Sequence, residues 1–189
     1  LSAERALSLA PDNVAALNLA GTIYRELGDY DNASKQLSAA LAINRKDSSA
    51  RANLGMLKLL KGDWADAWPL YESRLQAQDF KSPWGGFNLP TWRGEDLNGK
   101  RILVLSEQGY GDSIQFARFI PEVHKRGAEV AFAAQPELIR LFDGQIDGAT
   151  VLDMANPKQQ KFDFCALLMS LPGTLQVNDP AQIDGTPYL

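Results

Sequence analysis

A repeat spacing of 34 residues is the feature of this sequence that most constrains its fold. When the chain is aligned with itself at that offset, glycines fall on glycines and turn residues on turn residues. The matching pairs are Gly21 with Gly55, Gly28 with Gly62, Asp29 with Asp63, Tyr30 with Trp64, and Ala33 with Ala67. Two unrelated helical hairpins would not be expected to coincide at so many positions, so residues 1–80 are predicted to form a tandem helical array.

Each matched residue has a mechanical role that resembles the tetratricopeptide repeat, a helix-turn-helix unit of the same length. Gly21 and Ala33 are small where the two helices of a unit approach closely. Gly28 ends the first helix, Asp29 caps the second, and Tyr30 packs back over the turn. The resemblance implies a concave groove that holds a protein or peptide partner.

The array departs from the pattern of this family at several positions. Residues 1–10 match only the second helix of a unit, so residues 1–80 are expected to hold one half repeat and two complete repeats. Arg45 stands where the family places a repeat-ending proline. Arg51 and Lys58 stand where the first complete repeat has an apolar and an aromatic residue. The second complete repeat is therefore expected to pack more loosely.

Charge and composition argue against several classes of function. The chain carries 9 Lys and Arg against 10 Asp and Glu before Lys81, and 10 against 13 from there on, so no basic stripe favours nucleic acid. The longest apolar stretches are too short for membrane insertion. One cysteine and one histidine suit neither an internal disulfide nor an ordinary zinc site, so neither metal nor cofactor is expected. A reducing compartment, the cytoplasm, fits this composition.

A change of pattern divides the rest of the chain. Residues 81–100 lose the helical period and fill with proline and glycine, which is typical of a connector. Trp84, Phe87 and Trp92 make this segment apolar, so it is expected to pack against a domain rather than to swing freely. Residues 101–189 then read as an α/β domain that the end of the chain cuts short.

Strand and helix patterns alternate in this second half. Strands are expected at 101–106, 128–134, 149–153 and 162–169, and helices at 112–126 and 136–143. This order predicts a parallel, doubly wound sheet. Pro121 should kink the first helix. The eight residues before the fourth strand are too few for a helical crossover, so that connection is a bare loop or one strand is misassigned.

The loop after the first strand is the first place to look for a ligand, because open parallel sheets bind ligands outside the carboxyl ends of their strands. Gly109 and Gly111 would let backbone N–H groups approach a ligand closely, and the helix start would favour an anion. The segment fails as a dinucleotide fingerprint because Ile114 occupies the third glycine position. It also lacks the lysine of a phosphate-binding Walker loop.

Several segments resemble bacterial proteins in which tetratricopeptide repeats precede a heptosyltransferase-like glycosyltransferase with two Rossmann domains, the GT-B fold. The likeness is carried by LVLSEQGYGDSIQFARFIP from Leu103, by Arg126-Gly127-Ala128, by Gln135-Pro136-Glu137-Leu138, and by the run from Leu167 to Thr174. The resemblance implies a fold of class α plus α/β, with the second half being the N-terminal Rossmann-like half of a GT-B enzyme. It also implies a nucleotide-sugar donor, bound mostly by a second domain beyond Leu189, so this chain is expected to be inactive alone.

The same resemblance implies a catalytic base at Asp112, which opens the helix after the glycine loop. A carboxylate there would take the acceptor proton. Acceptor contacts are expected from Glu107, Gln108, Gly109, Gly111 and Ser170. His124 and Cys165 are assigned to no site.

Two alternatives stay open at this point. Asp112 followed by Gln115 is also a capping-box arrangement, which explains the aspartate without catalysis, and both roles are compatible. The whole chain is a glycosyltransferase fragment whose repeats bind or present the acceptor, or else a non-catalytic interaction scaffold with a degenerate Rossmann-like domain.

Overall fold

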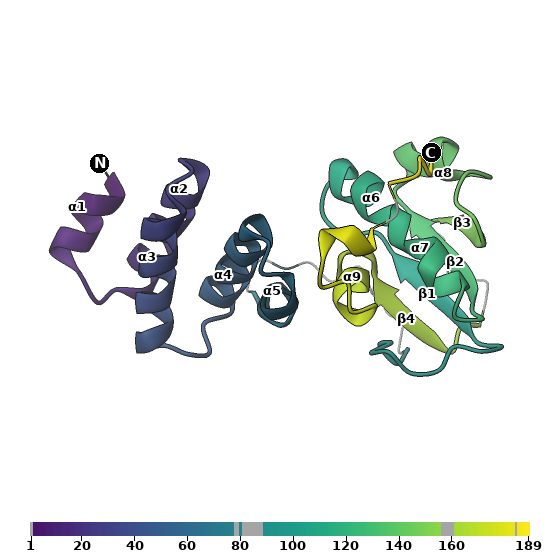
Figure 1. Ribbon diagram of the computed structural model, residues 1–189, viewed down its shortest axis with the longest axis horizontal. Helices are drawn as coiled ribbons and strands as arrows, with labels where there is room; N and C mark the ends of the chain where they lie inside the picture. Colours follow the sequence, from purple (N-terminus) through teal and green to yellow (C-terminus); the bar gives the residue numbers. More distant parts are fainter. Residues whose placement is uncertain (1, 78–79, 81–88, 156–160, 184) are drawn as a thin grey trace. The chain divides into compact units, whose positions relative to one another are not determined.

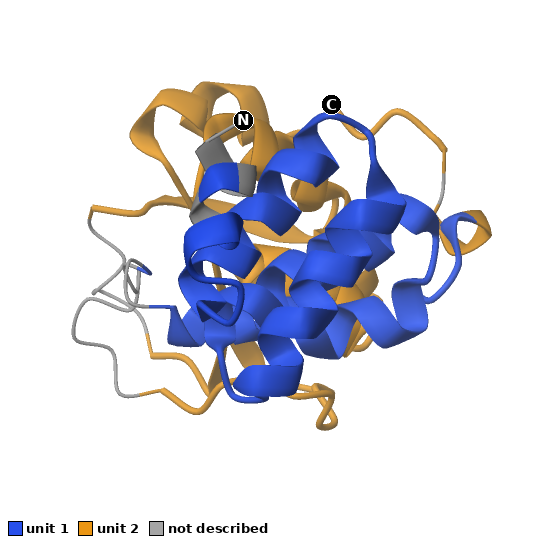
Figure 2. Cartoon of the chain, turned by 90° about the vertical axis from the view of Figure 1, so that its left-hand side faces the viewer, with its two compact units in different colours: residues 1–81, 178–180 blue, residues 82–177, 181–189 orange. Residues whose placement is uncertain are grey.

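The computed structural model describes residues 2–77, 80, 89–155, 161–183 and 185–189. The chain divides into two compact units, Leu1–Lys81 with Asn178–Pro180, and Ser82–Val177 with Ala181–Leu189. Figure 2 colours the two units separately. The first unit is helical and the second is built on a parallel sheet, so the predicted class of α plus α/β is confirmed.

The first unit is a succession of antiparallel helix pairs (Figure 1). Its elements are α1 (Ser2–Leu9), α2 (Val14–Glu26), α3 (Tyr30–Ile43), α4 (Ser48–Lys61), α5 (Trp64–Tyr71) and the 3₁₀ helix η1 (Glu72–Gln76). Leu37 and Leu57 are buried together with Ala33, so helices of successive repeats share one core. This is how a repeat array buries apolar faces that a single helix pair would leave exposed.

Close helix approach at Gly21 and Gly55 is confirmed. A Cβ added at Gly21 would lie 2.6 Å from Cγ of Leu37, and one at Gly55 would lie 2.5 Å from the backbone nitrogen of Tyr71. At both positions an added side chain would force its neighbours to shift. Gly21 and Gly55, which are 34 residues apart, therefore mark the closest approach of the paired helices. The backbone at Gly21 meets the Leu37 side chain, and the backbone at Gly55 meets the backbone of Tyr71.

The turns between paired helices are built as the sequence indicates. Gly62 adopts φ 87°, the left-handed conformation of a helix C-cap, and Gly28 adopts φ 77°. The Asp29 side chain accepts a hydrogen bond from the backbone of Asn32, whereas Asp63 begins α5 without such a bond. Instead, the Trp64 indole N–H donates to Leu59 O at 3.0 Å and packs back over the turn.

The two polar substitutions of the second repeat are accommodated differently. Lys58 lies 3.2 Å from Asp66 and 3.8 Å from Asp63 in two ion pairs. The Nε of Arg51 is buried and has no hydrogen-bond partner among the described residues. Arg51 thus places a buried nitrogen without a hydrogen bond at the position where Leu17, its counterpart in the preceding repeat, is buried and apolar.

The second unit has a four-stranded sheet in the order β3-β2-β1-β4, with every pairing parallel. Figure 1 shows the four strands side by side in this order. Their bounds are β1 Arg101–Leu105, β2 Glu129–Ala134, β3 Ala149–Asp153 and β4 Phe164–Leu167. All four expected strands are present, and the fourth lies on the far side of β1 from β2 and β3. Residues 156–160 of the connection before β4 lie outside the described residues.

Short helices follow strands β1, β2 and β4. They are α6 (Tyr110–Phe116), η2 (Ala117–Phe119), α7 (Ile120–His124), η3 (Pro136–Leu138), α8 (Ile139–Phe142), η5 (Leu168–Ser170), α9 (Leu171–Thr174) and η6 (Pro180–Gln182). The expected helix at 112–126 is broken rather than continuous. A 3₁₀ turn separates α6 from α7, and Pro121 falls in the first turn of α7, where its missing N–H costs nothing.

The described part of the connector belongs to the sheet. Thr91 forms a parallel bridge with Cys165 of β4, and the Trp92 N–H donates to Cys165 O at 2.8 Å. Trp92 is buried, and its indole N–H donates to Glu95 O. Trp84 and Phe87, on which the expectation of a packed connector also rested, lie outside the described residues.

Candidate functional site

The carboxyl edge of the sheet has a point where the strand order reverses, between β1 and β4. From β1 the chain moves to β2 and β3 on one side, while β4 pairs with β1 on the other. The loops that follow β1 and β4 therefore leave neighbouring strands at the same edge. In open parallel sheets such a switch point is the usual position of a ligand crevice.

Glu107 joins these two loops. It is only 5% exposed, and its Oε1 accepts a hydrogen bond from the Met169 backbone at 3.1 Å. A carboxylate that loses hydration requires such partners, because burial of an unpaired charge is costly. Glu107, which was predicted to contact the acceptor, thus has an observed structural role. It holds the loop after β1 against the residues after β4.

Polar side chains extend this arrangement toward β2. The hydroxyl of buried Ser113 donates to Gln135 Oε1 at 2.9 Å, and Gln135 Nε2 lies 3.5 Å from Gln108 O. Gln108 has φ 61°, a left-handed conformation that is strained for a residue with a side chain. Ser106 is fully buried, and its hydroxyl has no hydrogen-bond partner among the described residues.

Asp112 lies one turn farther into its helix than the sequence indicates. Helix α6 begins at Tyr110 with Gly109 as its N-cap, so the expected capping box from Asp112 to Gln115 is wrong. Asp112 instead occupies the third helical position, and its Oδ2 accepts the Gly109 N–H at 3.0 Å. A carboxylate can accept a hydrogen bond from a free backbone N–H either at the N-cap or at the third helical position. The sequence alone therefore does not distinguish these two positions for Asp112.

The remaining predicted contacts are distributed around the same edge. Gly109 and Gln108 are exposed in the loop, and Gly111 is exposed in the first turn of α6, where an added Cβ would meet nothing within 4 Å. Ser170 follows β4 as the N-cap of α9, without a side-chain capping bond. Its carbonyl accepts the Thr174 hydroxyl at 3.1 Å.

Sequence reasoning missed Ser106, Ser113, Gln135 and the pair Tyr110 and Glu137. The Tyr110 ring is half-exposed beside the loop, and the hydrogen bond of its hydroxyl to Glu137 raises the pKa of Tyr110. Gln135 and Glu137 follow β2 directly. Their position just after a buried strand could have identified them as site residues, since the carboxyl ends of parallel strands meet at one edge of the sheet.

Among the described residues, no group of three or more His, Cys, Asp or Glu side chains could hold a metal ion. No described helix is long and apolar enough to cross a bilayer.

Comparison with a family model identifies a TPR repeat over residues 21–62. The matched segment begins at Gly21, where two helices approach closely, and ends at Gly62, in the turn before α5. It agrees with the helix pairs, the left-handed turn glycines and the close contacts at Gly21 and Gly55.

Two longer proteins also match. Protein FlbA of Caulobacter vibrioides is 29% identical over 129 residues, which are 64% of this chain and about a fifth (21%) of that protein. A mutant O-GlcNAc transferase of Thermobaculum terrenum has a TM-score of 0.36 and 20% identity, over 74% of this chain and 35% of that one. A TM-score this low is insufficient to assign a common fold. The first unit thus contains a segment, residues 21–62, that matches a TPR repeat, and it is joined in one chain to a parallel α/β unit.

Proposed function

We propose that this chain is part of a repeat-containing glycosyltransferase that uses a nucleotide-sugar donor. In this proposal, residues 1–80 are the repeats, 81–100 the connector, and 101–189 the first Rossmann-like half of a GT-B enzyme. The repeats bind or present a protein or peptide acceptor, and the α/β half forms the acceptor side of the active site. The donor binds mainly to a further domain.

The observation that carries the proposal is the switch point between β1 and β4. The strand order 3-2-1-4 is the order of the first four strands of a Rossmann sheet, in which ligands bind where the order reverses. The loop that the glycosyltransferase resemblance singled out, residues 107–112, leaves the sheet at that point. Glu107 and Met169 hold the two flanking loops together there.

The chemistry assigned to Asp112 is proton removal from the acceptor hydroxyl. As the hydroxyl oxygen attacks the anomeric carbon, the proton passes to the carboxylate and the bond to the nucleoside diphosphate breaks. Oδ2 of Asp112 accepts the Gly109 N–H, and Oδ1 accepts no hydrogen bond from the described residues. One oxygen is thus available for a proton while the other orients the group. Glu107, Gln108, Gly109, Gly111 and Ser170 are proposed to contact the acceptor.

A second candidate, a non-catalytic scaffold, is favoured by one specific observation. The bond from Gly109 to Asp112 Oδ2 stabilises the start of α6, which accounts for Asp112 without any reaction. In this alternative the α/β unit is a docking module for proteins that the repeats also bind.

Turnover of sugar nucleotides distinguishes the two candidates. The full-length gene product is incubated with a panel of nucleotide sugars and with cell extract as the acceptor source, and release of nucleoside diphosphate is measured. The enzyme proposal requires release above the rate without protein for at least one donor, together with labelled sugar on a macromolecule. Absence of release for every donor, from protein with native circular dichroism, would favour the scaffold.

A further inference from the structure

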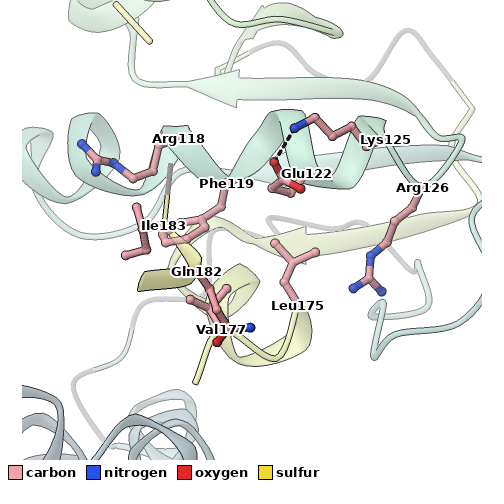
Figure 3. A pocket seen from close by; sticks show the side chains of 9 residues that line it. All are labelled: Arg118, Phe119, Glu122, Lys125, Arg126, Leu175, Val177, Gln182 and Ile183. Atoms are coloured by element: carbon pink, nitrogen blue, oxygen red, sulfur yellow. Dashed lines mark hydrogen bonds and ion pairs between the residues drawn. The ribbon is translucent and has the colours of Figure 1, made fainter. Parts of the chain in front are cut away.

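A cavity beside α7 in the α/β unit is lined by two arginines, a lysine and a glutamate over an apolar floor. Its volume is about 260 Å³, and it lies between α7 and the segment that follows α9. Phe119, Leu175, Val177 and Ile183 line it, with Arg118 at one end and Arg126 at the other (Figure 3). Arg126 comes just before β2, at the opposite edge of the sheet from the loop after β1, so this cavity is separate from the proposed active site.

Aromatic rings hold both guanidinium groups. Arg118 lies 4.8 Å from the ring centre of Tyr188, whose hydroxyl donates to Ile114 O. Arg126 lies 5.6 Å from the ring centre of Trp92, which is itself buried. A cation held on an aromatic face keeps its charge and its planar set of donors while losing little further freedom on binding an anion.

Neither guanidinium forms an ion pair with an acidic side chain of the described residues, and the Nε of Arg118 is buried without a hydrogen-bond partner there. Lys125, which also lines the cavity, lies 2.7 Å from Glu122 in an ion pair. The cavity therefore presents two arginines without an ion-pair partner among the described residues, with the paired Glu122 and Lys125 and an apolar surface between them (Figure 3).

The spacing of the two arginines selects among anionic ligands. Arg118 lies in the 3₁₀ turn η2 and Arg126 just after the end of α7, so their backbones are roughly 12 Å apart along the chain axis, too far for one carboxylate or phosphate to contact both. An extended peptide rises about 3.3 Å per residue and places every second side chain on one side. Acidic residues at i and i+4 are then about 13 Å apart, and the side chain at i+2 lies between them on the same face.

We propose that this cavity binds an extended acidic peptide segment in which an apolar residue at i+2 is flanked by acidic residues at i and i+4. The apolar side chain enters the cavity above Phe119 and Leu175. The two carboxylates pair with Arg118 and Arg126, to which they can form bidentate hydrogen bonds. This surface adds a protein-binding site in the α/β unit, independent of whether that unit is an enzyme.

Fluorescence anisotropy with the 189-residue chain tests the proposal. The probe is the labelled peptide Gly-Glu-Ser-Leu-Ser-Glu-Gly. Three control peptides change the acidic residues to Gln, change Leu to Ser, or rearrange the same residues as Gly-Ser-Glu-Leu-Glu-Ser-Gly. The probe is expected to bind about tenfold or more tightly than each control, with an affinity that falls as salt is raised.

Protein variants locate the site. Arg126→Gln, at an exposed position, is expected to weaken probe binding about tenfold, and Arg118→Lys severalfold because the charge remains but the planar fork is lost. Arg140→Gln on α8, an exposed arginine outside the cavity, is the matched control and should bind as the wild type does.

Three outcomes overturn the proposal: equal binding of the probe and the rearranged peptide, unchanged binding by Arg126→Gln, or binding to phosphatidylserine vesicles but not to the probe. The last outcome would identify a lipid surface as the partner instead.

Discussion

Replacement of Gly55 by alanine tests the packing of the repeats most sharply. The added Cβ would lie 2.5 Å from the Tyr71 nitrogen, 2.9 Å from its Cα and 3.0 Å from Ala67 O. All three are backbone atoms, so relief requires α4 and α5 to separate. Alanine in a helix interior gains about 1 kcal/mol over glycine, whereas overpacking of this kind costs about 3 kcal/mol. The expected net loss is about 2 kcal/mol.

Thermal denaturation followed by far-ultraviolet circular dichroism measures this loss. In a unit of this size, about 2 kcal/mol corresponds to a fall of roughly 8–16 °C in Tm. Hydrogen exchange should assign the faster opening to α4 and α5 rather than to the sheet, because each unit has its own core.

Two other glycines serve as matched controls. Gly111→Ala, in the exposed first turn of α6 with no atom near its Cβ, should leave Tm unchanged or raise it slightly. Gly21→Ala should cost less than Gly55→Ala, since its nearest contacts are side-chain atoms of Leu37 that can shift. A Gly55→Ala protein as stable as the wild type would refute the close approach of α4 and α5.

Three further perturbations follow from single contacts. Glu107→Ala should lower the free energy of unfolding by about 1–3 kcal/mol in urea denaturation, since the hydrogen bond from the Met169 N–H to the buried carboxylate is lost; no change would contradict this. Asp29→Ala should cost about 1 kcal/mol by the same assay, and Asp63→Ala less, because only Asp29 makes a side-chain capping bond; the reverse order would contradict this. Burial raises the pKa of Cys165 from an ordinary 9.0 to about 12. The folded state therefore holds the thiol proton more tightly, and this contribution to stability is complete below about pH 9 and is lost as the pH rises toward 12. Cys165→Ala should reduce that alkaline loss in urea denaturation at several pH values, and an equal loss in both proteins would contradict the assignment.

Local pattern was sufficient to predict the turn glycines of the repeats and the four strands of the sheet. Gly28 and Gly62 were predicted as helix ends, and both have the left-handed φ that favours glycine at a C-cap. The four strands were predicted from short apolar runs, and β1, β2 and β3 lie within one or two residues of the expected bounds. These signals depend on neighbours within a few residues, which the sequence displays directly.

Long-range contacts and helix starts were not predictable in the same way. Glu107 and Met169 are 62 residues apart, and their hydrogen bond depends on the pairing of β4 with β1. The bond between Ser113 and Gln135 likewise requires the loop after β1 to lie beside the end of β2. Asp112 was misplaced by one turn because an aspartate can satisfy free N–H groups from more than one position of the first turn.

The rate of nucleoside diphosphate release by full-length Asp112→Asn protein tests the central claim most directly. Asparagine keeps an oxygen that can accept the Gly109 N–H, so Tm should be unchanged, but it cannot take a proton. The account predicts a loss of about 10²–10⁴-fold in kcat, with full activity in the exposed control Asp143→Asn. Unchanged turnover by Asp112→Asn would contradict the assignment of Asp112 as the base, and with it the proposed active site.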